Sequence, residues 1–235
     1  RGLRPPWVHS TLVSRYAPRR MEPWLDYTLV EGIGQTAFAE RFRGLAHTPG
    51  GLVLPVIVER ALPGQEEHVL EAGHIARELA HPHLVAVHEI HNREGAVAYR
   101  FRPGRTLAEL LGAVRSRDLP ADESAGLLLG LQLLEGLEHL HERTQEGGSP
   151  LQLVHRALNP NNIWVSYDGY LAVGGFACAT HQGRARAPQP PQLGYRSPEG
   201  ALGGEEDRRS DIFSAGLIIY ELLSGRPAYD ERVSS

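Results

Sequence analysis

No segment of the chain is as informative as Leu153-Val-His-Arg-Ala-Leu-Asn-Pro-Asn-Asn-Ile-Trp-Val165. Its fifth residue, Ala157, has no group that could accept a proton or orient a hydroxyl. Asn162, five residues further along, keeps a polar amide. The segment therefore combines a polar loop with one position that is chemically empty.

Composition limits the kinds of protein that this chain can be. With 235 residues, of which 41% are hydrophobic, it can bury one large core or two small lobes. The longest apolar runs, 127–134 and 217–223, are far shorter than the roughly 20 residues of a membrane-spanning helix, so no membrane segment is expected. A formal net charge of -4 gives no general attraction for nucleic acid, and the single Cys178 excludes an internal disulfide. We expect a cytoplasmic protein.

The first part of the chain predicts a basic arm followed by a β-rich lobe. Residues 1–23 carry five arginines and no acid before Glu22, which is typical of a flexible arm. From Tyr27 to about Arg60, β-forming residues are punctuated by glycines, as in strands joined by tight turns. The lobe is expected to span residues 24–102. It is completed by one helix and two strands, over 66–79, 84–90 and 96–101.

Residues 103–235 predict a helical lobe. Asp122 is expected to cap a long helix over residues 123–142, whose leucines 127, 131, 134 and 137 fall on one stripe. Ser210 is expected to cap a second long helix over residues 211–224, which Gly225 ends. A shorter amphipathic helix is predicted over residues 106–114.

Four segments resemble the motifs of protein kinases, in that family's order and spacing. The segment quoted above is similar to the catalytic loop His-Arg-Asp-Leu-x-x-x-Asn. Residues 168–177 are similar to the segment that holds Asp-Phe-Gly, 195–199 to the Pro-Glu motif, and 207–227 to the buried helix that follows it. The resemblance is to bacterial serine/threonine kinases of the eukaryotic-like kind. It implies an α+β, bilobal fold with a small antiparallel β-rich N-lobe that contains one helix, and a mainly helical C-lobe.

In the nucleotide cleft that this resemblance implies, the phosphate loop has changed. The family's Gly-x-Gly-x-x-Gly lets backbone N–H groups approach the phosphates of ATP. Its three glycines are matched by Gly34, Thr36 and Ala39, so only the first remains. The valine that packs on adenine is matched by Arg41, a long cation.

The ion pair that grips the phosphates in the family is also replaced. Its lysine is matched by Glu59, whose charge would repel phosphate, and its helix glutamate by Ala72. Ile57 adds bulk where the family places alanine against the purine, and the bulky Tyr99 guards the pocket behind adenine. The cleft is expected to disfavour Mg-ATP.

Both catalytic carboxylates of the family are missing. Ala157 stands where an aspartate accepts the substrate proton, and Gly175 stands where an aspartate chelates magnesium, which leaves only Asn162 among the metal ligands. Losing one such group typically costs orders of magnitude in rate. We therefore expect a pseudokinase that is not an enzyme and needs no cofactor. No metal site is expected, because none of the 12 histidines shows a Cys/His spacing typical of zinc.

Residues of the family's structural frame are kept, which favours a regulatory or scaffolding module that binds proteins, such as an active kinase or another signalling protein. These frame residues are His155, Arg156, Phe176, Glu199, Asp211 and Gly216. Two alternatives stay open. One is a divergent serine/threonine kinase that retains binding of ATP and Mg or weak phosphotransfer, and the other is a sensor that binds a small ligand in the vacated cleft.

The helical lobe is expected to lack the family's last helices, because only eleven residues follow Ser224. Leucines that those helices would cover should then lie partly exposed. Large exposed apolar patches tend to mark interfaces, so we expect the chain to self-associate through this lobe, or to need a partner or a downstream segment to complete it. The sequence does not identify a partner or a pathway.

Overall fold

The structure is a computed structural model that describes residues 22–144, 148–181 and 193–229. The chain divides into two compact units, Arg1–Leu70 with Val87–Pro103 and Glu71–Ala86 with Gly104–Ser235, which are described separately. Residues 1–21 of the predicted arm lie outside the described part, and its last two residues begin a strand rather than extend the arm.

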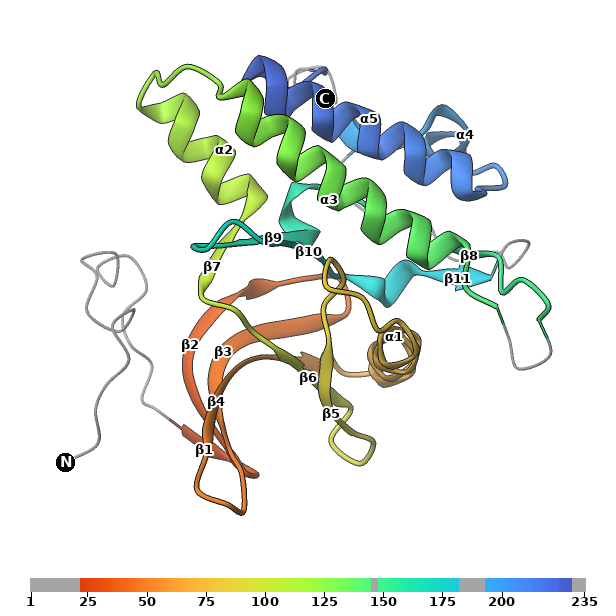
Figure 1. Cartoon of the computed structure of the whole chain (residues 1–235). Helices are drawn as coiled ribbons and strands as arrows, with labels where there is room; N and C mark the ends of the chain where they lie inside the picture. Colours follow the sequence, from red (N-terminus) through yellow and green to blue (C-terminus); the bar gives the residue numbers. More distant parts are fainter. Residues whose placement is uncertain (1–21, 145–147, 182–192, 230–235) are drawn as a thin grey trace. The chain divides into compact units, whose positions relative to one another are not determined.

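The first unit contains a six-stranded antiparallel sheet in the order β1-β2-β3-β4-β6-β5 (Figure 1), which confirms the predicted β-rich lobe. Its strands are β1 (Glu22–Trp24), β2 (Tyr27–Gln35), β3 (Ala39–His47), β4 (Val53–Ala61), β5 (Val87–His91) and β6 (Ala96–Arg100). The predicted helix is α1 (Glu66–Glu78), whose residues divide between the two units after Leu70.

Alternation along β4 gives the sheet two different faces. Val56 and Val58 are fully buried in a core with Tyr27, Leu29, Ala46 and Ala98. Because successive side chains of a strand point to opposite faces, Ile57 and Glu59 lie on the other face. Register pairs Ile57 with Tyr99 on β6 and Glu59 with Arg41 on β3. The residues expected to line the cleft therefore share one face of this sheet.

The second unit is mainly helical, as predicted. Its helices are α2 (Leu107–Ser116), α3 (Glu123–His141), α4 (Pro198–Ala201) and α5 (Arg208–Ser224). Its short strands are β7 (Gly104–Thr106), β8 (Leu153–Val154), β9 (Ile163–Ser166), β10 (Leu171–Val173) and β11 (Thr180–His181). They form two small sheets, ordered β10-β9-β7 and β11-β8.

Helices α3 and α5 lie side by side in this unit (Figure 1). Two glycines of α3 allow the close approach, since a Cβ at Gly126 would lie 3.0 Å from Leu223 and one at Gly130 would lie 3.2 Å from Ile219. Leu137 of the predicted leucine stripe is buried. The other three leucines of that stripe, at 127, 131 and 134, are exposed.

The ends of the long helices follow local capping signals. Asp122 caps α3 as predicted, because its side chain accepts a hydrogen bond from the backbone N–H of Ala125. The prediction that Ser210 caps α5 is wrong, since the helix begins at Arg208 and its cap is Asp207, which accepts from the Arg209 N–H. Gly225 ends α5 in the left-handed conformation, as predicted.

Candidate functional site

The turn between β2 and β3 is held by hydrogen bonds among its own residues. The Thr36 hydroxyl accepts hydrogen bonds from the backbone N–H groups of Phe38, at 3.2 Å, and Ala39, at 2.9 Å. The Thr36 N–H donates to the Ala39 carbonyl at 2.8 Å. Three N–H groups that could face an oxyanion are thus used inside the turn, and two of these bonds need the Thr36 hydroxyl, which a glycine would lack. Hydroxyl residues form such local bonds readily, so Thr36 was the sequence signal for this turn.

The tip of this turn is held by aromatic packing within the first unit. Phe38 is buried, and its ring stacks on that of His68 in α1 with 4.9 Å between ring centroids. A turn packed in this way is less free to move than a loop with three glycines would be. Gly34 keeps its role as a glycine, since its φ of 138° disfavours any other residue.

Arg41 and Glu59 form an ion pair across β3 and β4. The Arg41 Nε lies 2.7 Å from Glu59 Oε1, and the side chains are only 19% and 11% exposed. Tyr99 also hydrogen-bonds to Glu59; burial, followed by the charge of Glu59, raises the pKa of Tyr99 well above its ordinary value. Glu59 is therefore neutralised by Arg41, a pairing that the motif comparison alone did not reveal.

The position matched to the helix glutamate offers no charge. Ala72 is fully buried in α1, and Glu71, one residue earlier, is half-buried. Within the first unit, Ile57 is half-buried directly opposite Tyr99, which is itself buried. Ile57 and Tyr99 thus place bulk on the same face of the sheet as the Arg41–Glu59 ion pair.

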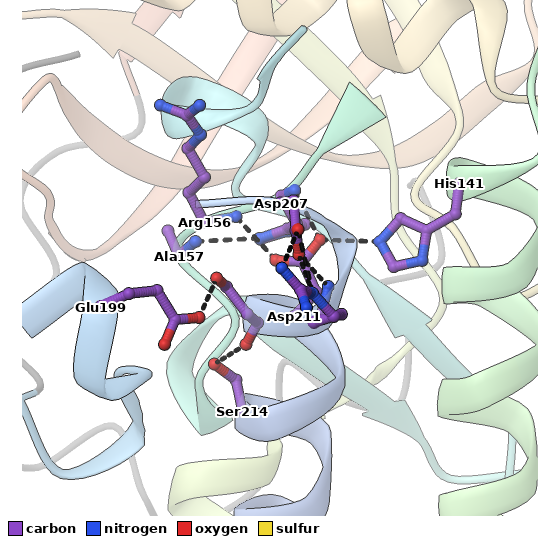
Figure 2. A network of polar contacts seen from close by, with 10 residues as sticks. His141, Arg156, Ala157, Glu199, Asp207, Asp211 and Ser214 are labelled. Carbon is purple, nitrogen blue, oxygen red and sulfur yellow. Dashed lines mark hydrogen bonds and ion pairs between the residues drawn. The ribbon is translucent and has the colours of Figure 1, made fainter. Parts of the chain in front are cut away.

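In the second unit, Asp211 of α5 organises the loop that the sequence singled out (Figure 2). Its buried carboxylate accepts hydrogen bonds from the backbone N–H groups of His155, at 2.8 Å, and Arg156, at 2.9 Å. The same carboxylate lies 2.8 Å from His141 Nε2 on α3. These bonds hold Arg156 in the left-handed conformation, with φ of 64°, which is costly for a residue other than glycine.

His155 connects this loop to the segment after β10. Its Nε2 lies 2.9 Å from the Gly174 carbonyl, and its Nδ1 accepts from the Ala157 N–H at 3.3 Å. Since a carbonyl can only accept, this arrangement places the proton of a neutral imidazole on Nε2. Burial lowers the pKa of His155, in keeping with the neutral form, and its ring packs on Phe176 with 5.2 Å between centroids.

Asn162 fills the space beside Gly175. A Cβ on Gly175 would lie 2.4 Å from the Asn162 Cγ and 2.6 Å from both amide heteroatoms. The backbone of Gly175 is left-handed, with φ of 79°, and the Asn162 Nδ2 donates to the Ala157 carbonyl at 2.8 Å. A side chain at position 175 therefore has no room while Asn162 keeps this orientation.

The arrangement does not fit magnesium as the resemblance would require. Gly175 supplies no oxygen ligand, and the Asn162 side chain occupies the space where a ligand at position 175 would begin. Across the described ranges, no cluster of three or more His, Cys, Asp or Glu side chains is placed to bind a metal ion. No helix among those residues is long and apolar enough to cross a membrane.

Two further frame residues lie on α4 and α5. Glu199 accepts a hydrogen bond from the Ser210 hydroxyl, which lowers the pKa of this carboxyl, and Ser214 donates in turn to the Ser210 carbonyl (Figure 2). Gly216 lies on an exposed part of α5, where a Cβ would meet no other atom. Glu199 thus ties α4 to α5, whereas nothing around Gly216 requires a glycine.

The comparisons with known proteins agree with this architecture. Residues 27–235 match the family described as the protein kinase domain. The tyrosine-protein kinase MasK of Myxococcus xanthus is 28% identical over 216 residues, which cover 87% of this chain and 33% of MasK. The serine/threonine-protein kinase PrkC of Bacillus subtilis is 29% identical over 161 residues, which cover 66% of this chain and 23% of PrkC. The chain thus spans about a third or less of these relatives.

A third relative, the probable serine/threonine-protein kinase PknB of Bifidobacterium longum, is 29% identical over 201 residues, 82% of this chain and 25% of PknB. All three relatives are named as kinases. The prediction that the chain is not an enzyme is therefore wrong, because these matches point to a family of enzymes. With a family match over most of its length, an antiparallel sheet and a helical unit organised by Asp211, the chain belongs to the protein kinase family.

Proposed function

We propose that this chain is a regulatory domain of a signalling protein, and that it acts mainly by binding other proteins. Its own phosphotransfer is slower, by orders of magnitude, than that of relatives with the complete set of motif residues. One observation carries the proposal: the Asn162 amide lies where a side chain at Gly175 would begin, at 2.4 Å from the expected Cβ. The family's magnesium ligand is thus replaced by packing.

The rate expectation follows from what phosphotransfer needs. Protein kinases use ATP and magnesium, and their catalysis depends on positioning and on charge stabilisation. Here position 157 has no base, position 175 has no ligand, and the cation of Arg41 is held by Glu59. Losses of single catalytic groups commonly cost about 100-fold or more, and the losses do not simply add. We expect a rate at least about 1000-fold below that of an intact relative.

The regulatory role is supported by what the fold retains. Asp211, His155 and Phe176 still connect the loop, α5 and the segment after β10, so the second unit keeps its fixed arrangement without the family's two catalytic carboxylates. Partners of this surface are proposed to be proteins, such as an active kinase or another signalling protein. A cytoplasmic location belongs to the same proposal and is supported by the single, buried Cys178.

The proposal can be tested by a single-turnover assay with radiolabelled ATP, run beside the kinase domain of PrkC. We expect labelling of a generic protein substrate to be at least about 1000-fold slower with this chain. A rate within about tenfold of PrkC would overturn the proposal. The Asn162→Ala variant serves as the control for signal that does not arise from this site.

A second measurement addresses protein binding. In the native host, deletion of this chain should produce a phenotype. A strain that carries Asn162→Ala should not show that phenotype, provided that the variant is folded and present at normal abundance. The deletion phenotype in that strain, together with loss of residual transfer, would show that chemistry rather than binding is the function.

A further inference from the structure

Three histidines gather in the second unit where the segment after α1 meets α3. His81 and His83 flank a proline after the end of α1, and His139 lies near the C-terminal end of α3. The His81 ring stacks on the His139 ring with 4.9 Å between centroids, and it lies at 63° to the His83 ring with 5.5 Å between centroids. The rings thus form a row of groups that can each take up a proton near neutral pH.

The segment that carries His81 and His83 is attached to two elements. The Val173 N–H of β10 donates to the His83 carbonyl, and the Val85 N–H donates to the Val173 carbonyl, each at 2.9 Å. On its other side the segment lies close to α3, since a Cβ at Gly136 would be 3.0 Å from the His83 carbonyl oxygen. The bonds to β10 join backbone groups alone, whereas His81 meets α3 through the ring of His139.

The surroundings of His83 suit its charged form. Its Nδ1 lies 3.0 Å from the Leu171 carbonyl oxygen, and its Nε2 lies 3.3 Å from a carboxylate oxygen of Glu135 on α3. A carbonyl and a carboxylate can only accept hydrogen bonds, so both contacts are satisfied when both ring nitrogens carry a proton. Glu135 is thereby used by His83, one turn of α3 before His139.

The surroundings of His81 suit its neutral form. Its Nδ1 accepts a hydrogen bond from the His83 backbone N–H at 3.3 Å, so the proton of the neutral ring lies on Nε2. Burial lowers the pKa of His81, the charges of His139 and His83 lower it further, and Glu135 opposes them. His139 offers no compensation, because its Nε2 is buried and has no hydrogen-bond partner among the residues that the structure describes.

We infer that the stack of His81 on His139 is an acid-sensitive latch, in which one proton at Nδ1 of His81 releases residues 80–82 from α3 while residues 83–85 stay on β10. A proton at Nδ1 turns the acceptor of the His83 N–H into a donor and places a charge between two other histidines. In the released form His81 returns to its ordinary pKa near about 6.5, so the latch is fully closed above this pH and weakens below it. The inference goes beyond the proposed function, because it concerns neither phosphotransfer nor a partner.

Hydrogen exchange of the full chain at about pH 7.5 and about pH 5.5, corrected for the pH dependence of intrinsic exchange, tests the latch. The probes are the amides of His83 and Leu84, which donate to His81 Nδ1 and to the His81 carbonyl. Their protection should fall by about three- to tenfold at the lower pH, and tenfold is the limit for one proton over this range. The amides of Val85 and Val173 should keep their protection.

Three variants separate the latch from a general effect of acid. His74→Gln, a change at an exposed histidine of α1, should behave like wild type. His81→Asn offers an uncharged oxygen to the same N–H at every pH, so the fall should disappear. His139→Phe keeps a ring for the stack but cannot gain a charge, so the fall should be smaller than in wild type.

Nitrogen NMR of the imidazole rings gives a second measurement, which needs no substitution. Near pH 7.5 the His81 ring should be neutral with its proton on Nε2, and a proton on Nδ1 would overturn the inference. An equal fall in His81→Asn and wild type would overturn it too, as would an equal loss of protection at Val85 and Val173. If His81→Asn does not fold, His139→Phe decides, because a fall as large as that of wild type refutes the latch.

Discussion

Glu59→Lys would restore the family's lysine, yet we expect it to destabilise the first unit. Glu59 and Arg41 are 2.7 Å apart with side chains 11% and 19% exposed, so the substitution leaves Arg41 buried beside a second cation. Breaking a buried ion pair typically costs about 3–5 kcal/mol. Tyr99 also loses a hydrogen-bond acceptor, which costs about 1 kcal/mol. We therefore expect the free energy of unfolding to fall by about 4 kcal/mol.

Urea denaturation followed by circular dichroism measures this change. The matched control is Glu40→Lys, because Glu40 pairs with Arg60 on the same two strands, also at 2.7 Å, but with side chains 41% and 39% exposed. An exposed pair contributes only about 0.2–1 kcal/mol. The exchange of both charges, Arg41→Glu with Glu59→Arg, should recover much of the loss. If Glu59→Lys costs no more than Glu40→Lys, burial of the pair does not matter and the reasoning fails.

Three further outcomes are expected. Gly175→Asp should lower the free energy of unfolding by about 2–4 kcal/mol, because its Cβ would lie 2.4 Å from Asn162 and the backbone is left-handed. In urea denaturation, adding Asn162→Gly should restore part of the lost free energy. If it restores none, the packing of Asn162 on Gly175 is not the cause of the loss. Burial lowers the pKa of His155, so below about pH 6.5 the unfolded chain binds a proton that the folded chain does not. Stability should then fall toward about pH 5, with a slope that His155→Gln reduces by up to about 1.4 kcal/mol per pH unit; an equal slope in the variant refutes this. We also propose self-association through the exposed face of α3, where Leu127 and Leu131 are 61% and 55% exposed. Light scattering should show wild-type oligomers that Leu131→Glu dissociates, and a wild-type monomer at high concentration would end this proposal.

Much of the fold could be predicted because it depends on local patterns. Alternating β-formers and glycines give the strands of the first unit, and the leucine-rich run capped by Asp122 gives α3. The first residue of α5 could not be predicted from local sequence, because Asp207 and Ser210 lie three residues apart and both residue types are good helix caps. In the structure the Ser210 hydroxyl donates a hydrogen bond to Glu199 of α4, and Asp207 caps the helix instead.

The motif comparison located the candidate site but not its contacts. It named His155 and Asp211 as frame residues, and the structure joins them by a hydrogen bond, to which His141 of α3 adds a contact that the motifs do not contain. The Arg41–Glu59 pair depends on the register between β3 and β4, which no single motif contains. The packing of Asn162 on Gly175 depends on a left-handed backbone that becomes visible only in three dimensions.

These contacts change what the substituted positions mean. Read as separate losses, Glu59 and Gly175 suggest that replacing each by the family's residue would restore a kinase site step by step. In the structure Glu59 forms an ion pair with the Arg41 guanidinium, and the Asn162 amide fills the space that a side chain at Gly175 would need. A single reversion therefore breaks a contact before it can restore a function. For Glu59 the partner Arg41 has to be altered as well, whereas for Gly175 the Asn162 side chain has to turn away, because Asn162 is itself the family's residue.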